Sequence, residues 1–301
     1  MTFTEAEIAS QPSAWRKTLE SVSRWEPVFR ELFGTGRVAL VGAGSSYYVA
    51  TAAAEYARES LGVAARAVAA SVYRPNPGEA VLFISRSGTT TEVLEAAQAA
   101  DRAAIRPRVS VTCDPGNPLA TRVDHSILLE WVREQSVVQT SSATSALLLL
   151  RAAVDRLAGR PLPGELPDLL ERVMTSPLPA EGVDHLVVLG SGWRFGVACE
   201  AALKAQEMAL LWTERYVPLE YRHGPMSCAG PSTLVVILDP SDERMAALAR
   251  DIGALGARVV QAEHDPMVEL VRLQRLAYAI SLRKGLDPDH PRHLRRSIEL
   301  G

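Results

Sequence analysis

The stretch VALVGAGSSYYVATAAAEYA, residues 38–57, decides the fold of this chain. A short apolar run leads into a Gly-x-Gly turn and then into a long alanine-rich segment, a pattern typical of a buried strand, a tight turn and a helix. The same pattern returns in LVVLGSGWRFGVACEAALKA, residues 186–205, where Gly190 follows Gly42 by 148 positions (190 − 42). The chain is therefore predicted to contain two copies of one strand-turn-helix unit.

Each copy continues with a second unit of the same kind. VLFISRSGTTTEVLEAAQAA, residues 81–100, and LVVILDPSDERMAALARDIGALG, residues 234–256, again read as strand, turn and helix. Further strands are expected at 108–112 and 258–262. Strands that alternate with helices indicate parallel sheets covered by helices on both faces. The expected fold class is therefore α/β, duplicated within one chain.

The domain organisation follows from the repeat. We expect packing helices in residues 1–33, a first domain at 34–160 and a second at 161–301, each of ordinary domain size. The proline-rich stretch 158–179 is the predicted link between the halves.

Composition excludes several classes of protein. The 301 residues are 47% hydrophobic and 22% charged, as in ordinary globular proteins, and the net charge of −3 suggests neither a nucleic-acid nor a membrane partner. No apolar run approaches membrane-spanning length, and the acidic N-terminus lacks the pattern of a signal peptide, so a cytoplasmic location is expected. The three cysteines have no paired spacing, and we expect no disulfide, metal or cofactor.

The turn SRSGTTT, residues 85–91, carries five side-chain hydroxyls between a predicted strand and a predicted helix. Backbone N–H groups and the positive end of the helix dipole favour an anion there, and uncharged hydroxyls can crowd around one phosphate. The alternative is an ordinary helix cap, which needs only one hydroxyl. The equivalent turn DPSDER, residues 239–244, is acidic and would repel phosphate. One phosphate site is predicted, in the first half.

Dinucleotide binding is disfavoured, although both halves carry a Gly-x-Gly turn. The third glycine of the G-x-G-x-x-G fingerprint is replaced by Tyr47 in the first half and by Phe195 in the second. No acidic residue follows at a position suited to a ribose.

The helix predicted at 195–211 carries Glu200, Lys204 and Glu207 at i, i+4 and i+7, which places them on one face. The simplest interpretation is a structural ion pair between Glu200 and Lys204. However, the rest of the helix is apolar, and only three of the 32 basic residues in the chain are lysine. A compact, titratable ammonium is therefore expected to have a use at position 204. A further candidate is His223, on a tight turn before Gly-Pro, although a lone loop histidine is more often incidental.

Taken in order, the motifs of the chain resemble those of double sugar isomerase (SIS) domain proteins. The chain is similar to the isomerase half of glucosamine-6-phosphate synthase and to stand-alone ketose/aldose isomerases and deglycases. The resemblance implies two flavodoxin-like subdomains, each a parallel five-stranded sheet flanked by helices. The motifs that carry it are GAGSSY, SRSGTT, EQSVVQTSS (134–142), EAALKAQE, LEYRHGP and the tail KGLDPDHPRHLRRSIEL (284–300).

The resemblance also implies a substrate site for a sugar 6-phosphate. Phosphate ligands would come from the first half, with backbone at Ser45 assisting: Ser46, Ser85, Arg86 (through its backbone), Ser87 and Thr90. Other substrate contacts would come from Val137, Thr140, Glu200 and the tail residue Arg296.

Three residues receive catalytic roles from the resemblance. Glu207 would move a proton between C1 and C2, and Lys204 would stabilise the enediolate. His223 would open the sugar ring from the neighbouring subunit, which implies a homodimer. Arg296 stands where the synthase pattern has a lysine, so Schiff-base chemistry is not expected there and Lys204 is the remaining site amine.

Three functions stay open at this point. The first is isomerisation of a hexose or amino-hexose 6-phosphate, with or without loss of an amine. The second is a lyase, a dehydratase or etherase of an N-acetylhexosamine 6-phosphate, which shares the first proton abstraction. The third is a non-catalytic phosphosugar sensor, against which the retention of Glu207, Lys204 and His223 argues.

Overall fold

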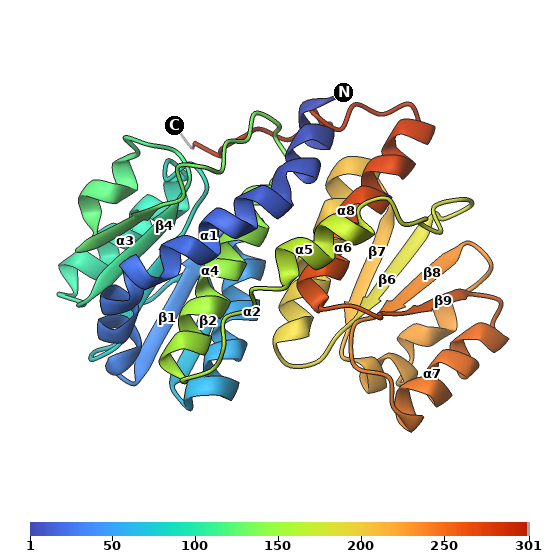
Figure 1. Ribbon diagram of the computed structural model, residues 1–301, viewed down its shortest axis with the longest axis horizontal. Coiled ribbons are helices and arrows are strands. Elements are labelled where there is room, and N and C mark those ends of the chain that lie inside the picture. Colours follow the sequence, from blue (N-terminus) through green and yellow to red (C-terminus); the bar gives the residue numbers. More distant parts are fainter. Residues whose placement is uncertain (300–301) are drawn as a thin grey trace.

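Two parallel sheets organise the chain, and the computed structural model describes residues 1–299 of it (Figure 1). The first half contains α1 (Phe3–Gly34), β1 (Arg37–Gly42), α2 (Ser45–Leu61), β2 (Ala64–Ala69), η1 (Ala70–Val72), β3 (Ala80–Ile84), α3 (Thr91–Arg102), β4 (Arg108–Thr112), η2 (Pro118–Arg122), β5 (His125–Leu128) and α4 (Ser141–Leu157). The second contains α5 (Leu166–Val173), β6 (His185–Leu189), α6 (Trp193–Ala209), β7 (Trp212–Tyr216), η3 (Pro218–Arg222), η4 (Pro225–Cys228), β8 (Thr233–Ile237), α7 (Glu243–Ala254), β9 (Arg258–Gln261) and α8 (Pro266–Arg283).

The strand orders are β2-β1-β3-β4-β5 in sheet A and β7-β6-β8-β9 in sheet B, and all pairings are parallel. The α/β fold with two flavodoxin-like halves is confirmed. Only sheet A has the expected five strands, because within residues 1–299 the second half turns into α8 after β9 and forms no counterpart of β5.

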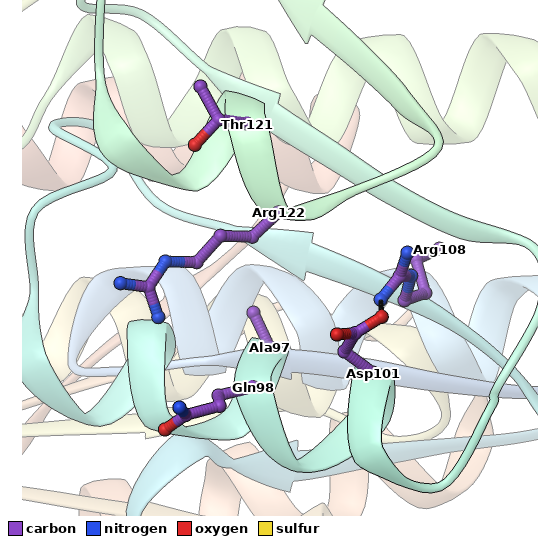
Figure 2. Close-up of a pocket in the computed structure, with 6 residues that line it drawn as sticks. All are labelled: Ala97, Gln98, Asp101, Arg108, Thr121 and Arg122. Atoms are coloured by element: carbon purple, nitrogen blue, oxygen red, sulfur yellow. Dashed lines mark hydrogen bonds and ion pairs between the residues drawn. The ribbon is translucent and has the colours of Figure 1, made fainter.

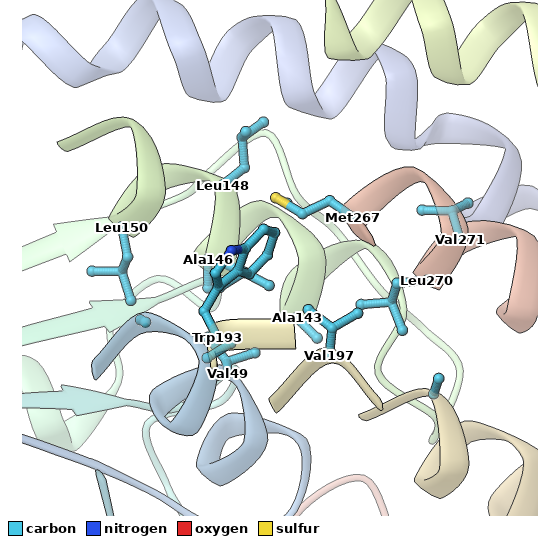
Figure 3. Packing of buried hydrophobic residues seen from close by; sticks show 14 of the residues in the cluster. Val49, Ala143, Ala146, Leu148, Leu150, Trp193, Val197, Met267, Leu270 and Val271 are labelled. Carbon is cyan, nitrogen blue, oxygen red and sulfur yellow. The ribbon is translucent and has the colours of Figure 1, made fainter. Parts of the chain in front are cut away.

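The layers run outward from a shared middle (Figure 1). Alternate residues of sheet A pack on α3 on one side and on α1, α2 and α4 on the other. Sheet B packs on α7 on its outer side and on α6 and α8 on its inner side. A single hydrophobic core therefore joins the two halves, with α2 and α4 facing α6 and α8 (Figure 3).

Both Gly-x-Gly turns have the same backbone reason. Gly44 precedes α2 with φ 56° and ψ −127°, and Gly192 precedes α6 with φ 53° and ψ −135°, a conformation that side chains with a Cβ rarely adopt. The helices that follow both have 17 residues. The glycine pattern thus belongs to a duplicated strand-helix turn, without requiring a dinucleotide.

Helices α2 and α6 run antiparallel and touch closely. A Cβ at Gly196 would lie 2.3 Å from the backbone nitrogen of Ala52, so only glycine allows this approach. Farther along the pair, the start of α2 meets the end of α6, where Lys204 donates to the Ser45 hydroxyl over 2.8 Å. The close packing of α2 on α6 therefore brings Lys204 of the second half to the start of α2 in the first half.

The N-terminal segment forms one helix, α1, which crosses α4 and buries Trp15 and Phe29 completely. The N–H groups at the start of α1 donate to the carboxylate of Asp289, from Phe3 N at 2.8 Å and from Thr4 N at 2.7 Å. The predicted link contains α5. The domain limits stay a prediction, and the last two residues of the second domain lie outside the described part.

Within residues 1–299 no helix is both long and apolar enough to cross a membrane.

Candidate active site

The hydroxyl-rich turn lies between β3 and α3, at the carboxyl edge of sheet A. This is the edge at which open parallel sheets bind ligands. A small polar cavity at this turn brings together predicted residues from three separate segments, and one further residue from a fourth. They are Ser46, Ser85, Arg86, Ser87, Thr90 and Arg296, together with Gln139.

An adjoining cavity of about 150 Å³ extends from the turn towards α6. Thr90 and Arg86 line it on the phosphate side, and Glu207 lines it from α6. Val137 and Gln139 contribute from the loop that precedes α4, and residues 294–298 contribute from the tail. A molecule anchored at the turn would therefore extend towards the Glu207 carboxylate.

Lys204 is fully buried, and its ammonium lies among oxygen atoms. Its Nζ is 2.5 Å from Glu207 Oε2 and 3.5 Å from Glu200 Oε1, besides the bond to Ser45. Burial alone would lower the pKa of Lys204, but the charges of Glu200 and Glu207 outweigh it and raise that pKa. The side chain is therefore a fixed cation beside Glu207, and it is poorly suited to act as a neutral amine nucleophile.

Glu200 lies behind Lys204 and is absent from the lining of the larger cavity. Its two carboxylate oxygens are buried, and apart from the ion pair of Oε1 with Lys204 they make no hydrogen bond of good geometry among the described residues. Burial raises the pKa of Glu200 to about 7, against the lowering effect of Lys204. The expected contact between Glu200 and a sugar stays a prediction, whereas its effect on the charge of Lys204 follows from the geometry.

The loop 134–140 folds around a buried carboxylate, that of Glu134. This group accepts hydrogen bonds from Thr140 N (2.9 Å), Ser142 N (2.8 Å) and the Ser142 hydroxyl (2.6 Å). The Thr140 hydroxyl also faces Glu134 at 3.3 Å, and Thr140 is fully buried. The structure thus uses the Thr140 side chain within the loop. Gln139, which lies within the predicted contact loop Val137 to Thr140 but was not named by itself, lines both cavities instead.

The tail residue Arg296 is tied to the protein. Its guanidinium donates to both oxygens of Asp114, at 2.7 and 3.0 Å, and to the carbonyl of Glu134 at 3.0 Å. Next to it, the Ser297 hydroxyl lies 2.8 Å from that of Thr89 and 3.3 Å from that of Ser87. The tail therefore forms a wall of the site, a role that no local sequence pattern indicates.

His223 is exposed and lies away from the cavities just described. The preceding Tyr221 packs on the α7 face of sheet B, whereas α6, with Glu207, covers the opposite face. Sheet B therefore separates His223 from Glu207 within one chain. A shared site would need the histidine of a second copy, and this stays a prediction.

A separate hollow lies between α3 and η2, at the amino edge of sheet A (Figure 2). Arg108 pairs with Asp101 at its rim, and Gln98 and Arg122 also line it. It contains none of the predicted site residues.

Within residues 1–299, the His, Cys, Asp and Glu side chains form no group of three arranged to hold a metal ion.

The fold and the cavity define an α/β protein with a polar turn suited to a phosphate and a lysine-paired glutamate beside it. Residues 31–156 match the SIS domain. Over 98% of its length, this chain is 29% identical to the isomerizing glutamine–fructose-6-phosphate aminotransferase of Methanothermobacter thermautotrophicus, across 344 aligned residues and 57% of that protein. The chain thus contains an SIS domain and is homologous to these aminotransferases, of which it spans less than two thirds.

Solved structures share the fold over nearly the whole chain. A glucosamine-6-phosphate deaminase of Thermotoga maritima is 28% identical, with a TM-score of 0.89, and covers 99% of this chain and 100% of its own. A tagatose-6-phosphate ketose/aldose isomerase of Escherichia coli, at 24% identity, shares the fold with a TM-score of 0.82 over 97% of both chains.

Proposed function

We propose that this protein is an enzyme that acts on a hexose or amino-hexose 6-phosphate by transferring a proton at C2, as in aldose–ketose isomerisation. One observation carries the proposal. The Glu207 carboxylate lines the same cavity as Thr90 and Ser45 of the first half, with the Lys204 ammonium 2.5 Å away. A phosphate at the turn and a carbonyl at Glu207 would occupy opposite ends of one cavity.

The chemistry assigns a task to each group. Phosphate binding by the hydroxyls of Ser85, Ser87 and Thr90 fixes the substrate far from its reacting carbons, so binding energy is used for orientation. Glu207 takes the proton from C2 of the open-chain aldose and returns it to C1. Lys204 lies where a cation stabilises the negative charge that develops on the enediolate oxygens.

Ring opening is assigned to His223 of a second copy. The hydrophobic side chains of Trp212, Val217 and Leu219 are exposed just before this histidine, on edge strand β7 and the segment after it. Such an apolar edge is typical of a surface that a partner covers. We therefore propose a homodimer with sites shared between subunits.

Sharing of the site can be tested by complementation. Co-refolding Glu207→Gln and His223→Ala chains should restore activity to about a quarter of the wild-type value, because about half of the dimers are then mixed and one of the two sites in each mixed dimer combines two intact residues. Activity that does not rise on mixing would contradict the shared site while leaving the role of Glu207 in place.

An amino-hexose 6-phosphate is the first substrate to test. The Thermotoga maritima relative, which this chain covers from end to end, is named a glucosamine-6-phosphate deaminase. In that reaction, moving the proton from C2 to C1 would give an imine at C2, which water would hydrolyse to the ketose and ammonia. The fixed positive charge of Lys204 and the Asp114-bound guanidinium of Arg296 favour a route without a Schiff base to the protein.

The experiment follows proton NMR in D₂O with glucosamine-, N-acetylglucosamine-, fructose- and glucose-6-phosphate. Solvent deuterium should enter C2 of an aldose phosphate, or C1 of fructose-6-phosphate, with the wild type and not with Glu207→Gln. A ketose, released ammonia or a new alkene signal would then distinguish isomerase, deaminase and lyase. Binding of a phosphosugar without exchange on any of the four would favour the sensor and contradict the proposal.

A further inference from the structure

The side chain of Arg86 has a place that its position in the phosphate turn does not indicate. It is almost completely buried, and its guanidinium donates four hydrogen bonds to other segments. Nη1 reaches Glu134 Oε2 (3.2 Å) and the carbonyl of Ser136 (3.1 Å). Nη2 reaches the carbonyls of Val137 (3.0 Å) and Arg296 (2.8 Å). One side chain thus joins the turn to both the 134–140 loop and the tail.

The backbone of Arg86 adds a second link to the tail. Its carbonyl accepts from the N–H groups of Cys113 (2.9 Å) and Asp114 (3.1 Å). The Asp114 carboxylate in turn holds the guanidinium of Arg296. Arg86 therefore binds the tail directly, at the carbonyl of Arg296. It also positions the Asp114 carboxylate, which binds the side chain of Arg296.

The charges make this arrangement depend on an arginine. The buried guanidinium is compensated by the fully buried Glu134, and its planar fork spans four acceptors on two segments. Lysine would place one point charge where the fork now bridges separate carbonyls, so it cannot hold both segments at once. The Nε–H is buried and has no partner among the described residues, which leaves one donor of the fork unused.

We infer that Arg86 is a positioning residue that couples occupation of the phosphate turn to the order of the 134–140 loop and the tail. Anchoring of a phosphate by Ser85 and Ser87 fixes the backbone on either side of residue 86. The guanidinium then holds Val137 and the tail as walls of the cavity that Glu207 lines. The inference rests on the phosphate site of the proposed function, although not on turnover.

The test is hydrogen–deuterium exchange with inorganic phosphate as the probe, compared with chloride at equal ionic strength. In the wild type, phosphate should slow exchange in peptides covering 85–91, 134–142 and 292–299 together. In Arg86→Lys, exchange in the latter two should rise about tenfold, and phosphate should protect 85–91 alone. Arg122→Lys, at the exposed hollow between α3 and η2, is the matched control and should behave as wild type.

Two results would overturn the inference. One is an Arg86→Lys protein in which phosphate still protects the loop and the tail. The other is a wild type in which phosphate protects the turn without them, or protects none of the three, and this result needs no variant to fold. The proposed function fails separately, through absence of deuterium at C2, since the exchange experiment uses no sugar.

Discussion

The two ends of the α2–α6 pair are equivalent by sequence and opposite in character. Helix α2 covers 45–61 and α6 covers 193–209, so every residue of α2 has a counterpart 148 positions later. At one end, Lys204 donates to Ser45 beside an open cavity. At the other, their counterparts Tyr56 (204 − 148) and Trp193 (45 + 148) stack edge to face with ring centroids 5.4 Å apart. The duplication gives both ends the same backbone arrangement. The side chains decide that the Lys204 end borders a cavity and that the Tyr56–Trp193 end is packed.

The turns after β3 and β8, which occupy equivalent positions in the two halves, also differ in character. Phe83 pairs with Val41 in sheet A, and Ile237 pairs with Leu189 in sheet B, so Ser85 and Asp239 follow their strands at equivalent positions. The Asp239 carboxylate accepts from Ser191 N at 2.9 Å and from its hydroxyl at 2.6 Å. The second half thus supplies its own anion at the start of α6. The Asp239 carboxylate of the acidic turn therefore occupies the place at which an external anion would otherwise bind.

The largest effect is expected from replacing Glu207, the carboxylate beside the cavity. Glu207→Gln should lower C2 exchange by about 10²–10⁴-fold, the usual contribution of a general base. The matched control is Glu59→Gln, at the counterpart position (207 − 148), which should leave exchange unchanged. Proton NMR in D₂O measures both, and an equal loss in the two variants would contradict the assignment of a single site.

The next largest effect is expected from disrupting the close contact between α2 and α6 at Gly196. Gly196→Val places a Cβ and two methyl groups on the backbone of Ala52, and should lower the free energy of unfolding by about 3 kcal/mol. Gly253→Ala, in α7 with nothing within 4 Å of its new Cβ, should raise it by about 0.5–1 kcal/mol. Urea unfolding measures both values. A Gly196→Val protein as stable as wild type would show that the halves do not depend on this approach.

A smaller effect concerns the buried charges at the open end. The pKa of Glu200 rises from 4.5 to about 7 on folding, so the folded state binds the proton more tightly and stability must fall as pH rises between these values. Relative to Glu200→Gln, the wild type should lose up to about 3 kcal/mol between pH 4.5 and pH 7. Lys204 stays charged throughout this range, so it does not contribute to the slope. Parallel stability profiles in urea would contradict the raised pKa.

The smallest effect concerns the closed end. Asp239→Ser, which installs the residue of the equivalent position, should cost about 1–2 kcal/mol through loss of the two bonds to Ser191. Phosphate should then raise the Tm of the variant more than that of the wild type, because the start of α6 lacks its built-in anion. Equal phosphate-dependent shifts would show that the position is closed by more than the carboxylate.

Much of the fold could be predicted because it is written in local patterns. The strand predicted at the start of the unit 81–100 corresponds to β3, Ala80–Ile84, since a short apolar run between turn signals has few alternatives. The helix predicted at 195–211 begins and ends two residues earlier in the structure. The residues that cap it are Gly192, with φ 53°, and Leu210, whose φ of 49° is not predicted by any helix-forming pattern. Boundaries depend on such backbone details, which propensities describe poorly.

The site was predicted in its residue types and less well in their contacts. Residue patterns indicated the turn and the charged face of α6, and the resemblance added the loop. The structure brings Ser85, Thr90, Val137 and Glu207 to adjoining cavities. The sequence could not indicate that Gln139 faces the cavities or that Glu7, on α1, accepts from Gln135 N at 2.5 Å and Ser136 N at 3.1 Å. Such partners lie far apart in the chain.

The sequence by itself determined the duplicated α/β frame and the single hydroxyl-rich turn, because strand, turn and helix are local choices of short segments. Only the tertiary structure decided which groups meet. The antiparallel approach of α2 and α6 carries Lys204 to Ser45, and long-range packing ties Arg86 to Glu134 and Arg296. These contacts join residues up to 210 positions apart, so they depend on the packing of distant segments and not on local sequence.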